Sequence, residues 1–176
     1  DMGRDHGVKQ LLKSCGKAVD NYKSAFKRKL DVTILLENSA GQKGSIGSKF
    51  EELGEILDKL SSKTYCVCLD TCHAFASGYD LSSEEACKEF ISEFDKTVGL
   101  GSLKFIHLND SKHEIGSHLD RHELFGHGKI GAKGLSTIIN DKKMGNVPMV
   151  MEPEFVSIEE DAKNLALIRK LRKQPN

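Results

Sequence analysis

The stretch VTILLE at residues 32–37 is a short and almost continuous apolar run, bounded by Asp31 before it and by the turn NSAGQKG after it. Such a run is typical of a parallel strand that is buried on both faces. Three further runs of this kind follow along the chain: YCVCLD at 65–70, LKFIHL at 103–108 and VPMVME at 147–152. The sequence therefore predicts four strands, and their neighbours decide how they are connected.

Apolar residues recur at helical spacing before, between and after these runs, as expected for amphipathic helices. The helical segments are 8–22, 50–60, 86–98, 135–139 and 162–171. Helices and strands thus alternate, which predicts an α/β fold with a parallel sheet and crossover helices. No linker or low-complexity segment divides the chain, so we expect one domain over residues 1–176.

The composition is ordinary for a soluble domain: 38% of the 176 residues are hydrophobic and 30% are charged. With 26 basic and 26 acidic side chains, the formal net charge is zero. This balance argues against a protein that binds nucleic acid through a broadly basic surface, but not against an enzyme whose metal ions supply local positive charge. No apolar run is long enough to span a bilayer, so we expect no membrane partner.

The first twelve residues lack the basic start and apolar stretch of a signal peptide. We therefore expect an intracellular protein, in the nucleus or mitochondrion of a eukaryote or the cytoplasm of a prokaryote. The five cysteines are then best explained as reduced thiols. Four of them, Cys15, Cys66, Cys68 and Cys87, are interpreted as small core residues. Cys72 stands beside other candidate functional residues, but no second cysteine or CxxC spacing supports it as a metal ligand.

Hydrophilic residues with metal-binding side chains stand at the end of each predicted strand. They are Glu37, Asp70, His107 and Glu152. An acidic residue at one strand end is often only a helix cap or the start of a loop. Because the carboxyl ends of parallel strands point to one rim, four such residues in succession indicate a functional site there.

Two nearby pairs extend this set of candidate ligands. Asp70 and His73 lie in DTCH, and Asp120 and His122 lie in DRH, within the long loop after the third predicted strand. The strand ends and these pairs together supply seven carboxylate and imidazole ligands, which suit zinc or manganese in a catalytic site. Seven ligands exceed what one tetrahedral zinc ion needs, so the sequence predicts at least two ions.

Four motifs closely resemble, in order and approximate spacing, those of the endonuclease IV family of apurinic/apyrimidinic endonucleases. The motifs are ENSAGQKGSIGSKFEEL (37–53), CLDTCHAFASGYDL (68–81), HLNDSKHEIGSHLDRHELFGHGKIG (107–131) and MEPEF (151–155). The resemblance implies a TIM (β/α) barrel, of which this chain would be an N-terminally truncated, C-terminal portion with about four to five β/α units. It also implies a centre of three Zn²⁺ ions that hydrolyses the phosphodiester 5′ to an abasic site in double-stranded DNA, a step of base-excision repair.

The resemblance assigns roles to the strand-end residues. It implies that Glu37 bridges two zinc ions and that Asp70, His107 and Glu152 are the remaining protein ligands of one of them. It also places Glu152 near the attacking water, so Glu37 and Glu152 are the candidate catalytic residues. A metal-bound hydroxide would attack phosphorus, and the metal ions would stabilise the leaving 3′ oxygen.

The same resemblance assigns His73, Asp120 and His122 as the protein ligands of the third zinc ion. Arg121, between two of these ligands, is a candidate contact to the DNA backbone, although a surface arginine in a long loop is an equally good interpretation. The glycines of GHGKIG (126–131) suit a tight turn at the start of a helix. The backbone amides of that turn would meet a phosphate, or the segment is a plain helix-entry turn.

The family pattern is incomplete in this sequence. Two further zinc-binding histidines of the family come from earlier strands and are absent, which leaves one of the three ligand sets with Glu37 alone. His6, in RDHG before the first predicted helix, does not fit the family pattern and is better explained as a capping or solvated residue. A complete TIM barrel usually has about 250 residues. We therefore expect that the missing N-terminal strands, or self-association, are needed to cover the open edges of the sheet.

Two other functions remain open on the sequence. A truncated paralogue that binds zinc or DNA without cutting it is favoured by the absent histidines. A metal-dependent sugar isomerase on a similar barrel also gathers Glu, Asp and His at strand ends, but it has no use for DRH in a long loop. Affinity for abasic DNA without a product would indicate the paralogue, and turnover of a sugar would indicate the isomerase.

Overall fold

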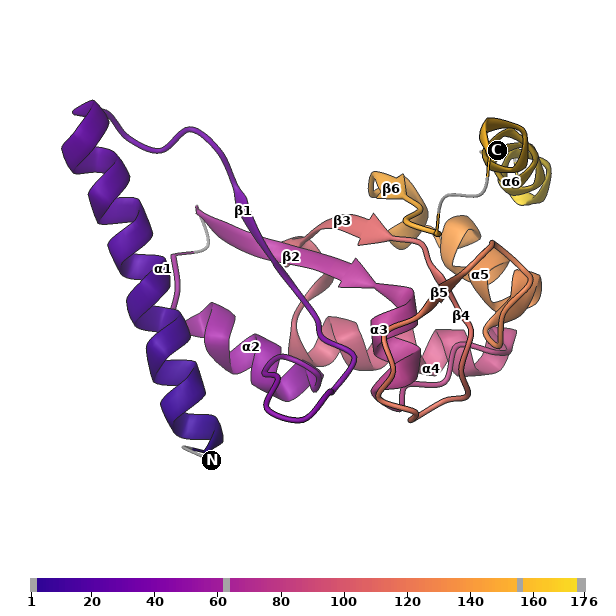
Figure 1. Cartoon of the computed structure of the whole chain (residues 1–176), viewed down its shortest axis with the longest axis horizontal. Helices are drawn as coiled ribbons and strands as arrows, with labels where there is room; N and C mark the ends of the chain where they lie inside the picture. The colour runs from indigo at the N-terminus through magenta and orange to yellow at the C-terminus, as the bar shows by residue number, and fades with distance from the viewer. Residues whose placement is uncertain (1–2, 62–63, 155–156, 174–176) are drawn as a thin grey trace.

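A parallel four-stranded sheet forms the centre of the molecule, with strand order β1-β2-β3-β6 (Figure 1). The computed structural model describes residues 3–61, 64–154 and 157–173. The strands are β1 (Ile34–Glu37), β2 (Tyr65–Asp70), β3 (Leu103–His107) and β6 (Met149–Val150). The register pairs Glu37 with Cys68 and Asp70 with His107, so the carboxyl ends of neighbouring strands meet at one rim of the sheet.

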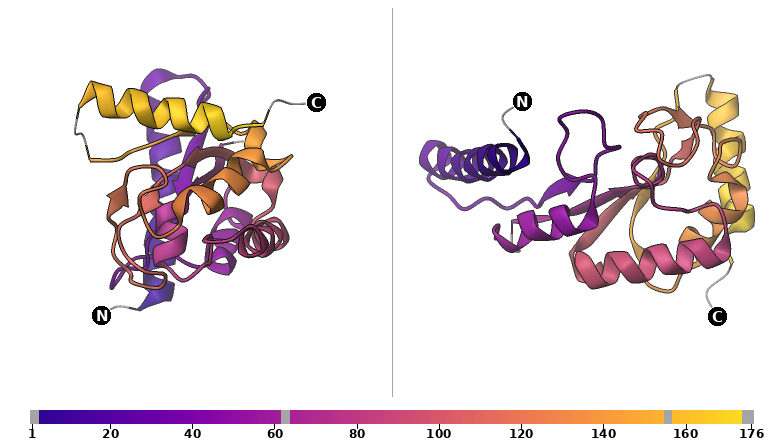
Figure 2. Two further views of the ribbon diagram at one scale, coloured as in Figure 1. Left: turned by 90° about the vertical axis from the view of Figure 1, so that its right-hand side faces the viewer. Right: turned by 90° about the horizontal axis from the view of Figure 1, so that it is seen from below.

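The alternation of helices and strands is confirmed. The main helices are α1 (Arg4–Phe26), α2 (Phe50–Asp58), α4 (Glu84–Thr97), α5 (Gly131–Asn140) and α6 (Ile158–Leu171). Short 3₁₀ turns lie at η1 (Leu100–Ser102) and η2 (Met144–Asn146). Helix α1 lies beyond β1 and α6 lies beyond β6, at opposite ends of the sheet (Figures 1 and 2). None of the described helices combines the length and the apolar character that are required to cross a membrane.

Two small elements near the rim are absent from the sequence prediction. Helix α3 (Thr71–Ala76) begins directly after β2, and an antiparallel hairpin of β4 (Asp110–Ser111) and β5 (His122–Glu123) lies within the predicted long loop. Each is too short to show a periodic apolar pattern, which explains why sequence periodicity does not reveal it. Both elements carry candidate ligands.

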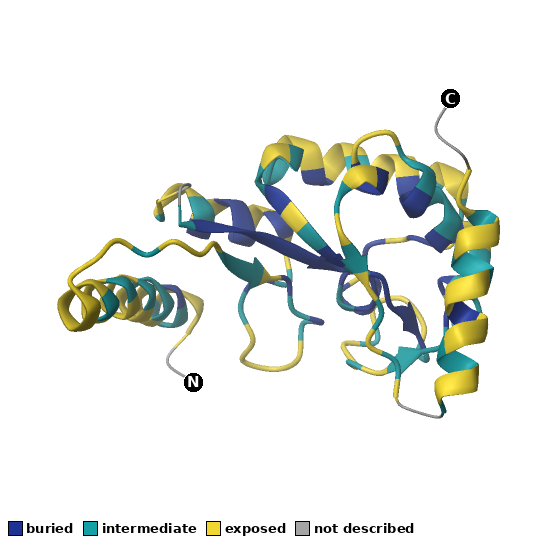
Figure 3. Cartoon of the chain, turned by 90° about the horizontal axis from the view of Figure 1, so that it is seen from above, coloured by how far each residue is buried: buried dark blue, intermediate teal, exposed yellow. Residues whose placement is uncertain are grey.

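The prediction that the first strand is buried on both faces is wrong. Strand β1 is only partly buried, whereas every residue of β2 is buried (Figure 3). The reason is position, because β1 is an edge strand with a partner on one side only. The same holds for β6, where the predicted run VPMVME shortens to a two-residue strand. Apolar composition alone does not distinguish a central strand from an edge strand.

The core lies between the sheet and helices α2, α4 and α5. Its largest fully buried side chains include Phe50, Leu69, Phe94, Ile106 and Leu135. Helix α1 contributes little to this core, since Val8 is its one buried residue in the described chain. A cavity of about 620 Å³ with a largely apolar lining lies beside β6 and α6. The expectation that the open edges need further strands or a second chain stays a prediction.

Close packing of α5 gives a first testable prediction. A Cβ atom at Gly134 would overlap the carbonyl oxygen of Leu81, whereas one at the exposed Gly16 of α1 would have no heavy atom within 4 Å. We expect Gly134→Ala to lower the free energy of unfolding by about 1–3 kcal/mol through overpacking. Gly16→Ala should raise it by about 0.5–1 kcal/mol, because glycine is unfavourable inside a helix. Urea denaturation of both variants and the parent checks this pair, and equal midpoints would contradict it.

Candidate metal centre

The four predicted strand-end ligands come together at the rim of the sheet. Glu37, Asp70 and His107 are the last residues of their strands, and Glu152 follows β6 by two positions. Their ligand atoms all lie within 4.8 Å of one another. The Nδ1 atom of His107 is 3.0 Å from a Glu37 oxygen, 2.9 Å from a Glu152 oxygen and 3.9 Å from an Asp70 oxygen. We call these residues the strand-end group.

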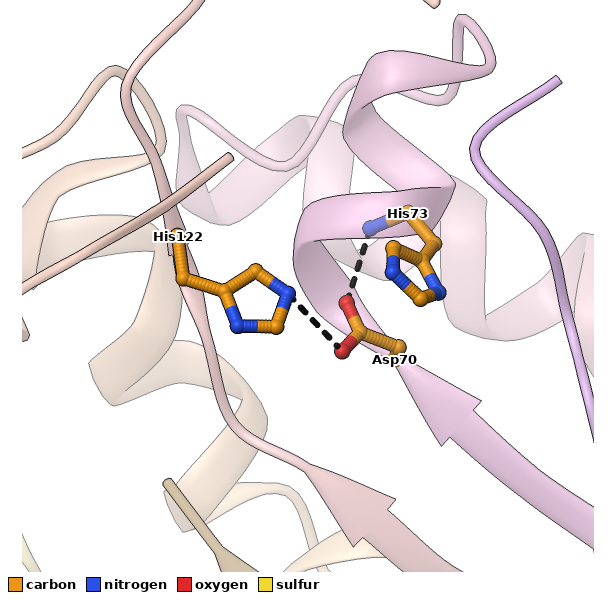
Figure 4. A group of neighbouring side chains, drawn as sticks. All are labelled: Asp70, His73 and His122. Carbon is orange, nitrogen blue, oxygen red and sulfur yellow. Dashed lines mark hydrogen bonds and ion pairs between the residues drawn. The ribbon is translucent and has the colours of Figure 1, made fainter. Parts of the chain in front are cut away.

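A second group adjoins the first. Here Oδ1 of Asp120 lies 3.1 Å from Nε2 of His73 and 3.3 Å from Nε2 of His122. We call these three residues the hairpin group, because two of them come from the hairpin segment. Asp70 links the groups, since its Oδ2 atom lies 3.6 Å from Nε2 of His122 (Figure 4). Glu37 is a second link, with an oxygen 3.4 Å from Nδ1 of His73.

The end of β2 explains how DTCH delivers two ligands to one place. Asp70 is the N-cap of α3, and its Oδ1 atom accepts a hydrogen bond of 2.8 Å from the backbone N–H of His73. This bond begins the helix and turns the His73 side chain toward the rim, beside the carboxylate (Figure 4). A single local capping interaction thus fixes the spacing of both residues.

The hydrogen bonds of the two hairpin-group histidines leave a lone pair facing the site. Nδ1 of His73 is 2.9 Å from the carbonyl oxygen of Asn38, and Nδ1 of His122 is 2.8 Å from that of Glu152. Since a carbonyl only accepts, each Nδ1 carries a hydrogen, and a ring in its neutral form presents an unprotonated Nε2. Nε2 of His73 is buried without a hydrogen-bond partner, although it lies 3.1 Å from Asp120.

This arrangement fits a divalent metal ion. An imidazole lone pair that faces a carboxylate oxygen is unfavourable unless a cation or a proton lies between them. A metal-binding histidine commonly donates its other ring N–H to a backbone carbonyl, as both of these histidines do. The mixture of imidazole nitrogen and carboxylate oxygen is the donor set that zinc takes in catalytic sites.

Burial and charge act together on the ionisable groups of the site. Burial raises the pKa of Asp70, while the neighbouring His73, His122 and Asn109 oppose this rise. For His73, burial favours the neutral ring, but the carboxylates of Asp70 and Asp120 outweigh it and raise its pKa. Carboxylates are concentrated at the rim, which makes it attractive to a cation.

Two asparagines that the sequence prediction missed support the ligands. Asn109 donates to Oδ2 of Asp70 at 2.6 Å and accepts from the backbone N–H of Glu152 at 2.8 Å. Asn38 accepts from the backbone N–H of Asp70 at 2.7 Å and donates to its carbonyl at 3.0 Å. The available signal was position, because each asparagine lies one or two residues after a strand-end ligand. Such neighbours orient ligands and tune the affinity for the metal.

Other candidate residues take different places. Cys72 lies near Asp120 and His122, but burial raises its pKa to about 12, which disfavours the thiolate that metal binding requires. Arg121 is exposed, and its guanidinium donates to the carbonyl of Asp120. His6 lies inside α1 rather than before it, with its ring near Gln10, and it belongs to none of the metal-binding groups among the described residues.

Comparison with known proteins places this chain in a family. A family model described as a xylose isomerase-like TIM barrel matches residues 3–174. The chain belongs to this family. The expected barrel architecture is thereby confirmed, and the open parallel sheet with its helices is consistent with part of such a barrel.

Within the TIM barrel family, the chain is similar to endonuclease IV proteins. A protein of Nitrosopumilus maritimus (strain SCM1) named "Probable endonuclease 4" is 46% identical over 164 residues, which are 93% of this chain and 56% of that protein. The "Apurinic-apyrimidinic endonuclease" of Caenorhabditis elegans is 46% identical over 123 residues, 69% of this chain and 31% of that protein. The expected resemblance to the endonuclease IV family is confirmed.

Solved structures agree with this assignment. The crystal structure of endonuclease IV from Thermus thermophilus superposes with a TM-score of 0.81 at 31% identity, over 96% of this chain and 58% of that one. A D-tagatose 3-epimerase-like protein, with a TM-score of 0.66 and 19% identity over 93% of this chain and 54% of that one, shares the fold. The chain therefore spans about half the length of the endonuclease IV proteins that it matches.

Proposed function

We propose that this chain carries the metal centre of a zinc-dependent apurinic/apyrimidinic endonuclease, which hydrolyses the DNA phosphodiester 5′ to an abasic site. The observation that carries the proposal is the pair of adjoining ligand groups at the rim, linked through Asp70 and Glu37. The names of the relatives support the reaction class. Glu37 is the one ligand that this chain would contribute to a third ion.

The bound ions would neutralise charge and activate water at a phosphodiester. The strand-end group would hold one ion and the hairpin group another. Glu152 holds the His122 ring through its backbone carbonyl, and its half-exposed carboxylate is placed to accept a proton at the open side of the rim. Glu37, with an oxygen near both His73 and His107, keeps the two groups at a fixed separation.

We assign the approach of the DNA to the exposed side of the hairpin, where Arg121 lies. Because its side chain is exposed and follows Asp120 directly, it is placed to meet a phosphate of the DNA backbone. A contact of this kind positions the duplex without reading its sequence. Arg121 is thus the residue of the hairpin that we assign to DNA.

Replacement of this residue tests the DNA contact. We expect Arg121→Ala to weaken binding to a short duplex with one abasic analogue, and to reduce the slope of log affinity against log salt by about 1. Fluorescence anisotropy over a salt series measures both quantities. Arg169→Ala, on the exposed surface of α6, is the matched control and should leave the slope unchanged. Identical slopes for Arg121→Ala and the parent would remove Arg121 from the DNA interface.

Incision of a labelled duplex with one abasic analogue tests the function directly. Cleavage 5′ to the lesion leaves a 3′-hydroxyl on the upstream fragment, which a DNA polymerase extends. We expect a product that the polymerase extends. A chelator added before the substrate should prevent its formation, and added zinc should restore it. A product that a polymerase cannot extend would contradict the side of cleavage that we propose.

The two alternative functions give different results in this assay. A chain that binds the abasic duplex without forming any product is the inactive paralogue. A chain that converts an aldose to a ketose and leaves the duplex intact is the isomerase. The isomerase alternative rests on the shared barrel fold and on the Glu, Asp and His residues at the strand ends, and the epimerase-like structure, at 19% identity, supports the fold alone.

A further inference from the structure

Asp110, on β4, is a buried carboxylate outside both ligand groups. Its side chain is fully buried, and its two oxygens accept hydrogen bonds from backbone N–H groups at 2.8 to 3.2 Å. The donors are the amides of Ser111, Gly126, Gly128, Ile130 and Gly131. Such a ring of amides is an anion-binding nest, and here the anion is part of the chain itself.

The segment GHGKIG (126–131) is shaped around this carboxylate. Gly126 and Gly131 have φ angles of 81° and 74°, which glycine adopts without strain. A Cβ atom at Gly128 would lie 2.5 Å from Oδ1 of Asp110 and would overlap the carbonyl oxygen of Ser111. The glycines therefore allow the backbone to approach Asp110 closely. The amides that were candidates for a phosphate contact are occupied by Asp110.

The nest closes the base of the hairpin that carries two ligands. β4 pairs Ser111 with His122 of β5, and the turn after β5 returns to Asp110 through its amides. The N–H of Lys129 also donates to the carbonyl of Ser111 at 2.8 Å. The Asp110 side chain and the neighbouring Ser111 backbone thus hold both ends of the segment that bears Asp120 and His122.

We propose that Asp110 is a positioning residue for the hairpin group, which fixes Asp120 and His122 in the geometry that binds a metal ion. The hydrogen bonds that the Asp110 carboxylate makes within the described chain are to backbone amides, so it acts through the backbone of the hairpin. Asparagine at this position would replace an acceptor oxygen by an N–H donor that faces other donors, leaving buried amides unpaired. Small shifts of the hairpin then displace the ligands.

This inference rests on the proposed metal-binding role, so the experiment measures metal affinity rather than activity. Zinc is titrated into the parent, Asp110→Asn and Asp120→Asn in competition with a chromophoric chelator. We expect Asp110→Asn to weaken the binding of one ion by about 10–100-fold and to leave the other ion unchanged. Asp120→Asn, which alters a ligand itself, should weaken the binding of the same ion more strongly. A purely structural role would weaken both ions together. Asp141→Asn is the matched control, since Asp141 accepts two backbone N–H bonds in the turn at the other end of α5.

The outcomes separate this inference from the proposed function. A parent chain that binds no zinc overturns the metal centre and the role of Asp110 with it. A parent that binds zinc, with Asp110→Asn unchanged, overturns the role of Asp110 alone. If Asp110→Asn does not fold, Gly128→Ala keeps the charge but crowds the carboxylate, and it should weaken the same ion. Unchanged zinc binding in folded Gly128→Ala would likewise contradict the proposal, and faster exchange of the Ile130 amide would support it.

Discussion

Replacement of Glu37 by glutamine should lower the rate of incision by about 10²–10³-fold, because it removes a carboxylate charge on which the bound metal ions depend. Glutamine keeps the shape of the side chain but supplies one neutral acceptor oxygen in place of a carboxylate. Glu37 lies 3.0 Å from Nδ1 of His107 and 3.4 Å from Nδ1 of His73, so its charge serves both ligand groups. Single-turnover incision of a duplex with one abasic analogue measures the effect.

The fold should survive this substitution. Glu37 ends an edge strand, and 37% of its side-chain surface is exposed, so no buried core contact is lost. Glu89→Gln, on the exposed surface of α4, is the matched control and should incise like the parent. If Glu37→Gln retained the parent's rate, Glu37 would not be a ligand of the reacting centre. Its contacts with both ligand groups would then not contribute to incision.

Replacement of Asp120 by asparagine should remove one zinc ion and lower the rate of incision by at least about 10²-fold. Oδ1 of Asp120 lies between two imidazole Nε2 atoms, at 3.1 Å and 3.3 Å, and it is the one carboxylate of the hairpin group. Without its charge, His73 and His122 remain as neutral ligands. Metal content after dialysis and single-turnover incision are measured on the same preparation.

A surface substitution of the same type serves as the comparison. Asp20 lies on the exposed face of α1, and we expect the Asp20→Asn variant to retain the parent's zinc content and rate of incision. Loss of incision in Asp120→Asn with full zinc content would mean that Asp120 acts on the substrate rather than on the metal. Retention of both properties would contradict the assignment of the hairpin group.

Much of the fold and the site was predictable because both depend on local sequence. The apolar runs and the helical spacing place each strand between helices, and a parallel sheet then brings its carboxyl ends to one rim. Glu37, Asp70, His107 and Glu152 follow from that rule alone. His73 follows too, because the Asp70 cap turns it toward the same place.

The remaining features depend on tertiary structure. Asn109 bonds to a residue 43 positions later in the chain, and Asn38 to one 32 positions later, so neither spacing is visible in a local pattern. In the sequence, Asp110 is not distinguishable from other acidic residues in loops. Its role is visible only in the structure, where the amides of residues 126–131 surround it. The exposure of β1 was also unpredictable, because it depends on whether another strand lies beside it and not on the apolar residues that it contains.

Zinc content per chain is the measurement that tests the central claim most directly. The purified chain is loaded with zinc and dialysed against buffer without metal. The zinc that remains per chain is then measured by inductively coupled plasma mass spectrometry. The two adjoining groups predict about two retained ions per chain, one for each group. Retention of no zinc by the folded parent chain would contradict the claim that the rim of this sheet is a metal centre.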